Sequence, residues 1–361
     1  MQQSRTSAAE WARRAAIAEN AVNHRFGHRV LGLPNTWLGR TSAGAAGLTT
    51  RLREWNYWWQ AHYLDCLIDA QWRRSIAGEA VDLSRARALL RGIRLRNFFV
   101  LVNSFYDDMA WLALAVDRAQ QLSRAARGRD FRGSRRVHRS LGRQLHQALS
   151  DELGGGIYWS KKRDYKNTAA NGPAALYFAR TGDEERAQEI LDWLHERLWD
   201  AEPGVYVDGL HLRQDGPERE GTVWSYNQGP VLGALLELAD HAGNLERAAE
   251  LIAGISSGLT ENGMVRLHGD GDRGLFTGIL LRYLALAARH DGLPEPSRAL
   301  AHQLVLSTAE QLWTSGSAQN VFTEDLQLSA AKCFPPGRPV GLSGQLQAWM
   351  AFESAHRLQL V

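Results

Sequence analysis

Apolar residues recur along this chain at the spacing of α-helices, and the helices that they predict are of two kinds. In the first kind, apolar side chains occupy one face and polar side chains the other, which is typical of a helix that covers a core from outside. These amphipathic helices begin at capping or acidic residues, namely Asp183, Asn244 and Ser297. Their apolar faces span residues 187–198, 248–255 and 300–312. We therefore expect an outer layer of helices.

The second kind of helix is rich in Ala, Gly and Leu on several faces, so it should be buried nearly all round. Such segments cover residues 110–119, 169–179, 229–239 and 278–288. Each follows a junction rich in aromatic and amide residues, and six such junctions recur about every 50 to 65 residues. The junctions lie at residues 58–60, 103–108, 164–167, 224–228, 275–278 and 341–345.

Buried and amphipathic helices alternate, with roughly six of each kind, the first near residues 8–22 and the last near 342–357. A ring satisfies this pattern, because the buried helices then shield one another and the amphipathic helices cover them. The sequence predicts an all-α fold, an (α/α)6 barrel that takes up residues 1–361 as a single domain. In such a ring the six junctions converge on one cleft.

Short β-prone pieces interrupt the helical pattern. Residues 205–207 and 210–212 are expected to form a small hairpin whose turn is Asp208-Gly209. The glycine-rich residues 154–159 should form a flexible rim, and residues 32–50 a long loop.

The composition suits one large core and does not demand a nucleic-acid partner. Of the 361 residues, 44% are hydrophobic and 22% charged, and the net charge is only +3. Much of the basic excess lies between Arg124 and Arg143. A solvated face and a polyanion site are both open there, and we favour the solvated face.

Cysteine usage and hydropathy exclude several further classes of protein. Cys66 and Cys333 cannot build a disulfide framework, and no metal-ligand spacing is present, so we expect neither a metal nor a cofactor. Residues 1–20 lack the apolar core of a signal peptide, and no segment approaches the length that spans a bilayer. We expect a cytoplasmic monomer without a membrane partner, or a secreted one if the true start site differs.

The stretch from Asn103 to Trp111 carries the strongest chemical signal, because Asp107 and Asp108 stand side by side among aromatic residues and an amide. Like charges a few ångströms apart cannot both ionise freely, so one carboxyl can stay protonated as an acid while its neighbour is anionic. A structural role is also open. Ser104 and Asp107 match a capping box, and Asp108 would favour the helix dipole.

Residues 105–115 closely resemble the catalytic segment of family 76 of the glycoside hydrolases, the endo-α-1,6-mannanases, and so do 165–172 and 225–229. Residues 276–284 and 58–60 are weaker matches, and all five segments follow the family's order. The resemblance implies an (α/α)6 barrel that hydrolyses α-mannan or manno-oligosaccharides with retention of configuration. It implies that Asp107 is the nucleophile and Asp108 the acid/base. Neighbouring helical side chains diverge by about 100°, which allows the roughly 5 Å carboxyl separation of retaining enzymes.

Other junction residues are candidates for binding sugar, because amides offer donors and acceptors and aromatic rings can stack on sugar faces. The candidates are Gln60, Asn103, Tyr106, Trp159, Asp164, Tyr165, Asn167, Asn171, Tyr226, Asn227, Gln228 and Phe276. For the amides, capping of the inner helices is an equally open role, and for most of the aromatic residues core packing is. Asp164 could instead pair with Lys166, and Asp208 is expected to be a turn residue rather than a ligand.

Three other functions are compatible with a helical ring. A transglycosylase would pass the same mannosyl intermediate to a sugar. A sugar epimerase would use paired histidines, whereas these junctions carry acids and amides. A carbohydrate-binding protein without activity would not need the aspartate pair.

Overall fold

The computed structural model describes residues 6–44, 55–317 and 319–360, and the described residues are mostly helical. Part of the loop expected at residues 32–50 and part of the N-terminal segment examined for export signals lie outside these ranges. Among the described residues, no helix is long and apolar enough to cross a membrane.

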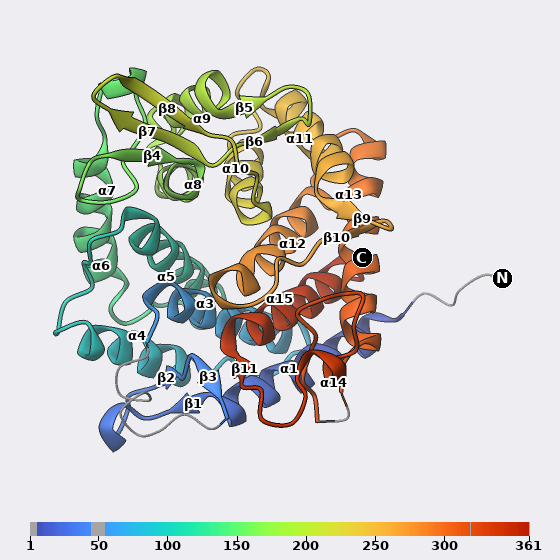
Figure 1. The fold of residues 1–361 in the computed structure, drawn as a ribbon. Coiled ribbons are helices and arrows are strands. Elements are labelled where there is room, and N and C mark those ends of the chain that lie inside the picture. Colours follow the sequence, from blue (N-terminus) through green and yellow to red (C-terminus); the bar gives the residue numbers. More distant parts are fainter. Residues whose placement is uncertain (1–5, 45–54, 318, 361) are drawn as a thin grey trace.

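Six helices of the described chain form an inner ring, in which each helix packs against the next and the last closes on the first (Figure 1). Alanine and glycine allow the close approach. A β-carbon on Gly278 of α12 would lie only 2.7 Å from the backbone of Gln347 in α15. The inner helices are α3 (Tyr57–Ile76), α5 (Tyr106–Arg127), α8 (Thr168–Thr181), α10 (Ser225–Glu237), α12 (Phe276–Ala287) and α15 (Leu342–Leu358).

An outer layer covers this ring, and its members alternate with the inner helices along the chain (Figure 1). Its continuous helices are α1 (Ala8–Arg25), α4 (Ser84–Arg96), α9 (Glu184–Leu198), α11 (Asn244–Gly258) and α13 (Glu295–Thr314). The sixth position is filled by α6 (Ser134–Val137), a π-helical turn η2 (His138–Gly142) and α7 (Arg143–Ala148). The (α/α)6 barrel expected from periodicity is confirmed.

The strands are short and lie in the connections. They pair as β1 (Gly27–His28) with β2 (Leu38–Gly39), β3 (Ser42–Ala43) with β11 (Val340–Gly341), β5 (Trp199–Asp200) with β6 (Val205–Tyr206), β9 (Thr260–Glu261) with β10 (Met264–Val265), and β4 (Tyr165–Asn167) with β7 (Gly209–Arg213) and β8 (Gly216–Glu220). Single turns η1 (Val30–Gly32), η3 (Glu152–Gly154) and η4 (Gly271–Leu275) and the short α14 (Ala330–Cys333) complete the loops.

The hairpin expected around Asp208-Gly209 is wrong. Strands β6 and β7, which flank that dipeptide, pair with other strands instead of with each other. The real hairpin joins β7 to β8, and Arg213 faces Gly216 across its turn. Gly216 has φ of 121°, a conformation that its lack of a side chain allows. Asp208 is thereby left free to face the inner ring.

Four inner helices each hold a backbone segment at one end of the barrel through the same pair of hydrogen bonds. The fourth residue of each is an amide whose oxygen accepts from, and whose NH2 group donates to, one backbone residue. Buried backbone groups outside a helix or sheet need such partners. The pairs are Gln60 with Gly39, Asn171 with Ile157, Gln228 with Tyr206, and Gln345 with Phe322. The loops that shape this end of the barrel are therefore fixed to the ring itself.

A buried charge cluster ties the inner helices together further along their length. Asp65 and Asp69 of α3 pair with Arg118 of α5 and Arg282 of α12, and Arg357 of α15 also reaches Asp69. Burial alone would raise the pKa of Asp69, but the three guanidinium groups outweigh it and hold that pKa below its usual range. The cluster therefore crosslinks helices that are distant in sequence.

Candidate active site

A cavity of about 510 Å³ opens at the end of the barrel where the inner helices begin. This volume is in the range of small-molecule sites. Its walls combine aromatic rings with carboxylates and amides drawn from connections all around the ring. It is lined by Trp55, Asn56, Tyr57, Trp58, Phe105, Asp107, Asp108, Trp111, Trp159, Tyr165, Asn167, Asp208, Tyr226, Asp272 and Phe276. Five of the six predicted junctions thus converge on this cavity, whereas the junction at residues 341–345 contributes no lining residue.

Asp107 and Asp108 lie in the first turn of α5, and a neighbouring loop fixes the start of that helix. The backbone N–H of Tyr106 donates to the carbonyl of Trp159 at 2.8 Å, and Phe105 forms an antiparallel bridge with Ser160. The capping-box alternative is wrong, because Phe105 is the N-cap and no side chain caps the helix. Both carboxyls face the cavity instead.

Asp107 is half-buried at the cavity wall, and its two oxygens differ in their surroundings. Its Oδ2 accepts from the indole N–H of Trp159 at 3.1 Å, whereas Oδ1 has no hydrogen-bond partner among the described residues. Burial raises the pKa of Asp107 to about 7, although the Trp159 N–H and backbone amides of the helix start oppose the shift. The charge of Asp208 raises it further.

Asp108 is held by Asn103, whose side-chain NH2 donates to Oδ2 at 2.5 Å. The orientation of that amide is fixed, because the Asn103 oxygen accepts from the backbone N–H of Phe105 at 3.0 Å. Burial raises the pKa of Asp108 well above its usual value, and the charge of Asp107 adds to the rise. Asp107 receives more hydrogen-bond donors than Asp108 does, so its ionised form is the better stabilised of the two.

Asp208 is a third carboxylate in the cavity, although the sequence suggested a turn residue. It accepts from the hydroxyl of Tyr165 at 2.7 Å and from the side-chain amide of Asn227 at 2.8 Å. Burial raises its pKa despite these donors. The ring of Tyr165 also stacks on His211 at 4.0 Å, so the strand pairing of β4 with β7 positions this group.

Asp272, in η4, is a fourth carboxylate at the cavity wall. One of its oxygens, Oδ1, accepts from the side chains of Asn56, Trp58 and Trp59, at 2.8 to 2.9 Å. These three donors come from the start of α3, so Asp272 links α3 to the loop before α12. The rings of Tyr226 and Phe276 stack beside it at 4.0 Å, and Trp58 lies 6.1 Å from Tyr226.

The structure brings together only some of the residues expected to bind sugar. Trp159, Tyr165, Asn167, Tyr226 and Phe276 line the cavity. Asn103 and Asn227 lie behind it and hold Asp108 and Asp208.

The remaining candidates do not line the cavity. Gln60, Asn171 and Gln228 are fully buried and use their amides on backbone groups. Tyr106 is buried in the core, because the first turn of α5 directs it away from the aspartates. Asp164 is exposed on the outer surface and forms no ion pair with Lys166. Lys166 instead donates to three backbone carbonyls, including that of Ser150 at 2.9 Å.

Sequence reasoning missed a further group of lining residues. They are Trp55, Asn56, Tyr57, Trp58, Phe105, Trp111 and Asp272, together with Asp208. Trp111 is one turn beyond Asp107 on α5, and its indole N–H is buried without a partner, so helical spacing could have found it. Asp272 lies two residues after Asp270 among glycines, a pattern typical of a loop that gave no comparable signal.

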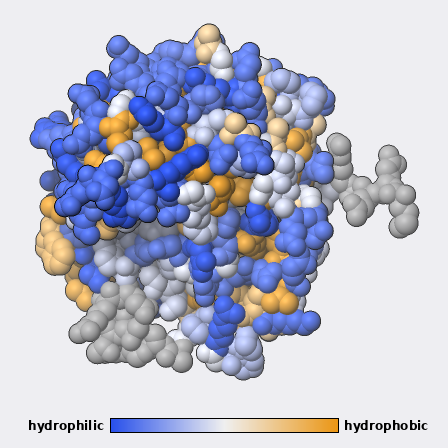
Figure 2. Space-filling view, turned by 45° about the horizontal axis from the view of Figure 1, so that its top comes forward, coloured by the Kyte–Doolittle hydropathy of each residue, from blue (hydrophilic) through white to orange (hydrophobic). Residues whose placement is uncertain are grey.

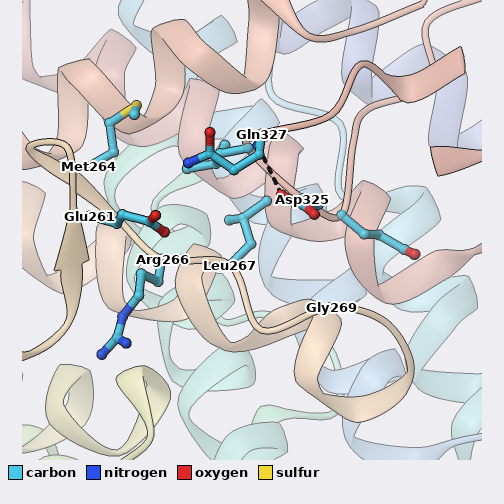
Figure 3. Close-up of a pocket in the computed structure, with 9 residues that line it drawn as sticks. Glu261, Met264, Arg266, Leu267, Gly269, Asp325 and Gln327 are labelled. Carbon is cyan, nitrogen blue, oxygen red and sulfur yellow. Dashed lines mark hydrogen bonds between the residues drawn. The ribbon is translucent and has the colours of Figure 1, made fainter. Parts of the chain in front are cut away.

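Another cavity, of about 240 Å³, lies at the outer side of the barrel between β10 and the loop before α14 (Figure 3). Glu261, Arg266, Asp325 and Gln327 line it, and the backbone N–H of Gln327 donates to Asp325 (Figure 3). It contains the adjacent carboxylates Glu324 and Asp325, but no aromatic ring is among the described residues that line it. Among the described residues, no group of three or more His, Cys, Asp or Glu side chains is placed to hold a metal ion.

Comparisons with known proteins agree with this geometry. The family model described as glycosyl hydrolase family 76 matches residues 32–354. No curated protein matches the chain. Among solved structures, the α-1,6-mannanase from Salegentibacter sp. is 28% identical, with a TM-score of 0.83 and coverage of 96% of this chain and 98% of that one.

Two further structures are similar to this chain over nearly all of its length. An inactive variant of the Salegentibacter enzyme, with two consecutive aspartates replaced and α-1,6-mannotetrose bound, is 29% identical with a TM-score of 0.83, covering 96% of this chain and 99% of that one. The Lin0763 protein from Listeria innocua is 25% identical with a TM-score of 0.79, covering 97% and 98%.

Proposed function

The chain belongs to glycosyl hydrolase family 76, and on this premise we propose that it cleaves α-1,6-mannosidic bonds by a retaining, double-displacement mechanism. It is a glycoside hydrolase, and mannan is the substrate class that its family and its similar structures support. The α-1,6 linkage is supported by the mannotetrose held in the related inactive mannanase.

One observation carries the proposal: two adjacent, half-buried carboxyls with raised pKa values face a cavity lined by aromatic rings. Glycoside hydrolysis needs one carboxylic acid to protonate the leaving oxygen and one carboxylate to stabilise or attack the anomeric carbon. Aromatic rings supply flat surfaces for sugar C–H groups. The lining contains no histidine, which disfavours an epimerase that shuttles a proton between paired imidazoles.

In the first step, a carboxylate oxygen of Asp107 attacks the anomeric carbon. The glycosidic C–O bond breaks, and the leaving oxygen takes the proton of Asp108, so that a mannosyl ester forms on Asp107. In the second step, Asp108 accepts a proton from water, whose oxygen attacks the anomeric carbon. The ester bond breaks, and both carboxyls return to their starting states.

The surrounding residues have positioning roles in this scheme. The Trp159 N–H donates to Oδ2 of Asp107 and so fixes the orientation of the nucleophile, and Asn103 orients the acid/base. Asp208 and Asp272 offer acceptor oxygens for sugar hydroxyls, while the stacked Tyr226 and Phe276 form a platform for a sugar ring. These assignments rest on their places in the cavity wall.

The two aspartates are distinguished by substrates with different leaving groups. We expect Asp107→Asn and Asp108→Asn each to reduce turnover of α-1,6-mannotriose by at least about a thousandfold, because each step needs both groups. On an aryl α-mannoside whose leaving group needs no protonation, Asp108→Asn should still release the phenol in a burst, whereas Asp107→Asn should not.

Asp164→Asn is the matched control, because this exposed aspartate lies outside the cavity. It should match the wild type on both substrates. Wild-type turnover of mannotriose by either cavity variant would refute the proposed mechanism, and equal loss on the aryl mannoside would refute the division of roles.

A further inference from the structure

On the face that Figure 2 shows, the surface is mostly hydrophilic, with hydrophobic residues gathered in separate groups. Of the eight large hydrophobic side chains exposed in the described part of the chain, five lie in two short segments. We call these five the apolar patch: Leu31, Leu33, Phe98, Phe99 and Val100. The two segments meet, because Leu31, Phe98 and Phe99 line one cavity of about 320 Å³.

The backbone holds these side chains outward. Leu31, Phe98 and Phe99 have φ values of 48°, 53° and 65°, in the left-handed region that residues with a β-carbon rarely adopt. Phe98 is 85% exposed and Leu31 78%, so burial of these side chains does not offset the strain within the monomer. Strain that persists without local benefit points to a function of the segment.

The protruding loop is also firmly built. The guanidinium of Arg94 donates to the carbonyl of Phe99 at 2.8 Å. The side-chain amide of Asn97 donates to the carbonyls of Val100 and Val102, at 3.3 and 3.0 Å. The two phenylalanines are therefore presented by an ordered loop.

Positive charge borders the apolar patch. The sequence has no Asp or Glu between Glu19 and Glu54, and none between Asp82 and Asp107, whereas α4 alone carries five arginines. Two of them, Arg91 and Arg94, line a cavity next to the patch together with Arg132 and Arg136. None of these four forms an ion pair with a described residue, so their charge is not compensated within the protein.

We propose that the apolar patch and its arginine border dock this protein on the surface of an anionic lipid bilayer. The phenylalanines and leucines would enter the boundary of the acyl chains, and the arginines would contact headgroup phosphates. A second copy of the chain fits less well, because a two-fold interface would set one arginine border against the other. Nucleic acid fits less well too, because Leu31 and Val100 offer no stacking face.

This docking goes beyond the proposed function and does not depend on it. It has one consequence for the cleft, since Trp55 lines both the active-site cavity and the cavity under the patch. A molecule docked through the patch holds the mouth of the cleft beside the lipid surface, where glycans attached to the membrane are presented.

Vesicle co-sedimentation of the full chain tests the proposal. The wild type should pellet with equimolar phosphatidylcholine and phosphatidylglycerol vesicles at low salt, and remain largely in solution with phosphatidylcholine alone. Phe98→Asn/Phe99→Asn should weaken the partition at least about tenfold, because two aromatic side chains no longer insert. Asn suits the positive φ of both positions, so this variant should fold. Arg91→Gln should weaken it about fivefold.

Ile76→Asn is the matched control, because this exposed residue lines a different cavity with Arg289. It should bind as the wild type does, and all variants should keep wild-type activity on soluble mannotriose. The proposal is overturned if the wild type does not pellet with anionic vesicles, or if the double Asn variant pellets equally well. A wild-type dimer that the double variant abolishes, or preferential binding of an oligonucleotide, would also overturn it.

Discussion

At the scale of single residues, the site depends on burying two carboxyls that water would otherwise keep ionised. Asp107 has its pKa raised to about 7 by burial, which sets it apart from a surface aspartate. The proposed nucleophile must be ionised to attack. Activity should therefore have an acidic limb near neutrality, well above the pKa of an ordinary aspartate.

The position of this acidic limb should respond to the two groups around Asp107. Trp159→Phe removes a donor that favours the ionised form, so the pKa of Asp107 should rise and the limb should move to higher pH. Asp208→Asn removes a nearby negative charge, so the limb should move to lower pH. The pH dependence of kcat/KM on α-1,6-mannotriose measures both shifts.

Opposite signs for these two variants separate an electrostatic effect from general damage, which would lower activity at every pH. Asp164→Asn again serves as the control, because that residue lies on the outer surface. Shifts of both variants in the same direction would contradict the assignment of the limb to Asp107.

The raised pKa of Asp107 also costs stability at neutral pH. A carboxyl whose pKa is higher in the folded than in the unfolded protein stabilises the fold at low pH, and this contribution is lost as pH rises towards the folded pKa. Asp107→Asn should therefore raise the free energy of unfolding by roughly 1 to 4 kcal/mol above pH 7. Below about pH 4 the gain should vanish.

Denaturant unfolding of the wild type and of Asp107→Asn at both pH values measures this gain. A variant that is less stable than the wild type above pH 7 would contradict the burial of an ionisable carboxyl at this position.

The local sequence pattern identified some of the carboxylates of the cavity but not others. The pair Asp107-Asp108 was recognisable because its chemistry lies in adjacent positions. Asp208 and Asp272 acquire their roles from partners that are 43 residues away (Tyr165) and 214 residues away (Trp58). Such contacts exist only after the ring has closed, so single-sequence reasoning could not assign them.

At the scale of elements, residues at the start of four inner helices hold neighbouring loops in place, in addition to shaping the site. The amides Gln60, Asn171, Gln228 and Gln345 occupy the fourth residue of their helices and satisfy loop backbone groups. The recurrence of amides at the junctions could be recognised in the sequence, but their hydrogen-bond partners could not. Three of these amides were expected to bind sugar, because a buried amide and a ligand-binding amide look alike in sequence.

Gln345 tests the structural role without touching the cavity. Gln345→Ala leaves the N–H and the carbonyl of Phe322 buried without partners. Each unsatisfied group costs roughly 1 to 3 kcal/mol, so the free energy of unfolding should fall by about 2 to 5 kcal/mol. Gln327→Ala, at an exposed position, should change it by less than about 0.5 kcal/mol.

Chemical denaturation of these two variants makes the comparison. Equal stability of Gln345→Ala and the wild type would show that the amide contacts do not hold the loop.

At the scale of the whole molecule, the fold was accessible from the sequence because one rule repeats. Segments apolar on all faces alternate with amphipathic ones, and a closed ring satisfies both. The small sheets were not accessible, since strands of two or three residues are defined by partners rather than by their own pattern. The hairpin wrongly predicted at Asp208-Gly209 shows this. Strand β6 pairs with β5, which precedes it in the chain, and β7 pairs with β4 and β8.

The ring also explains why the site can be both buried and reactive. Loops fixed by the inner helices close over the entry of α5, and the buried charge cluster of Asp65, Asp69, Arg118 and Arg282 crosslinks the helices below. A rigid frame of this kind holds Asp107 and Asp108 in position, where partial removal from water raises the pKa values of both carboxyls.

The configuration of the first product tests the central proposal most directly. Proton NMR of wild-type enzyme acting on α-1,6-mannan fragments should show the α-anomer of the new reducing end before mutarotation. This outcome is expected because two successive displacements at the anomeric carbon restore its configuration. The first appearance of the β-anomer would contradict a covalent intermediate on Asp107, and no new reducing end at all would contradict the proposed substrate.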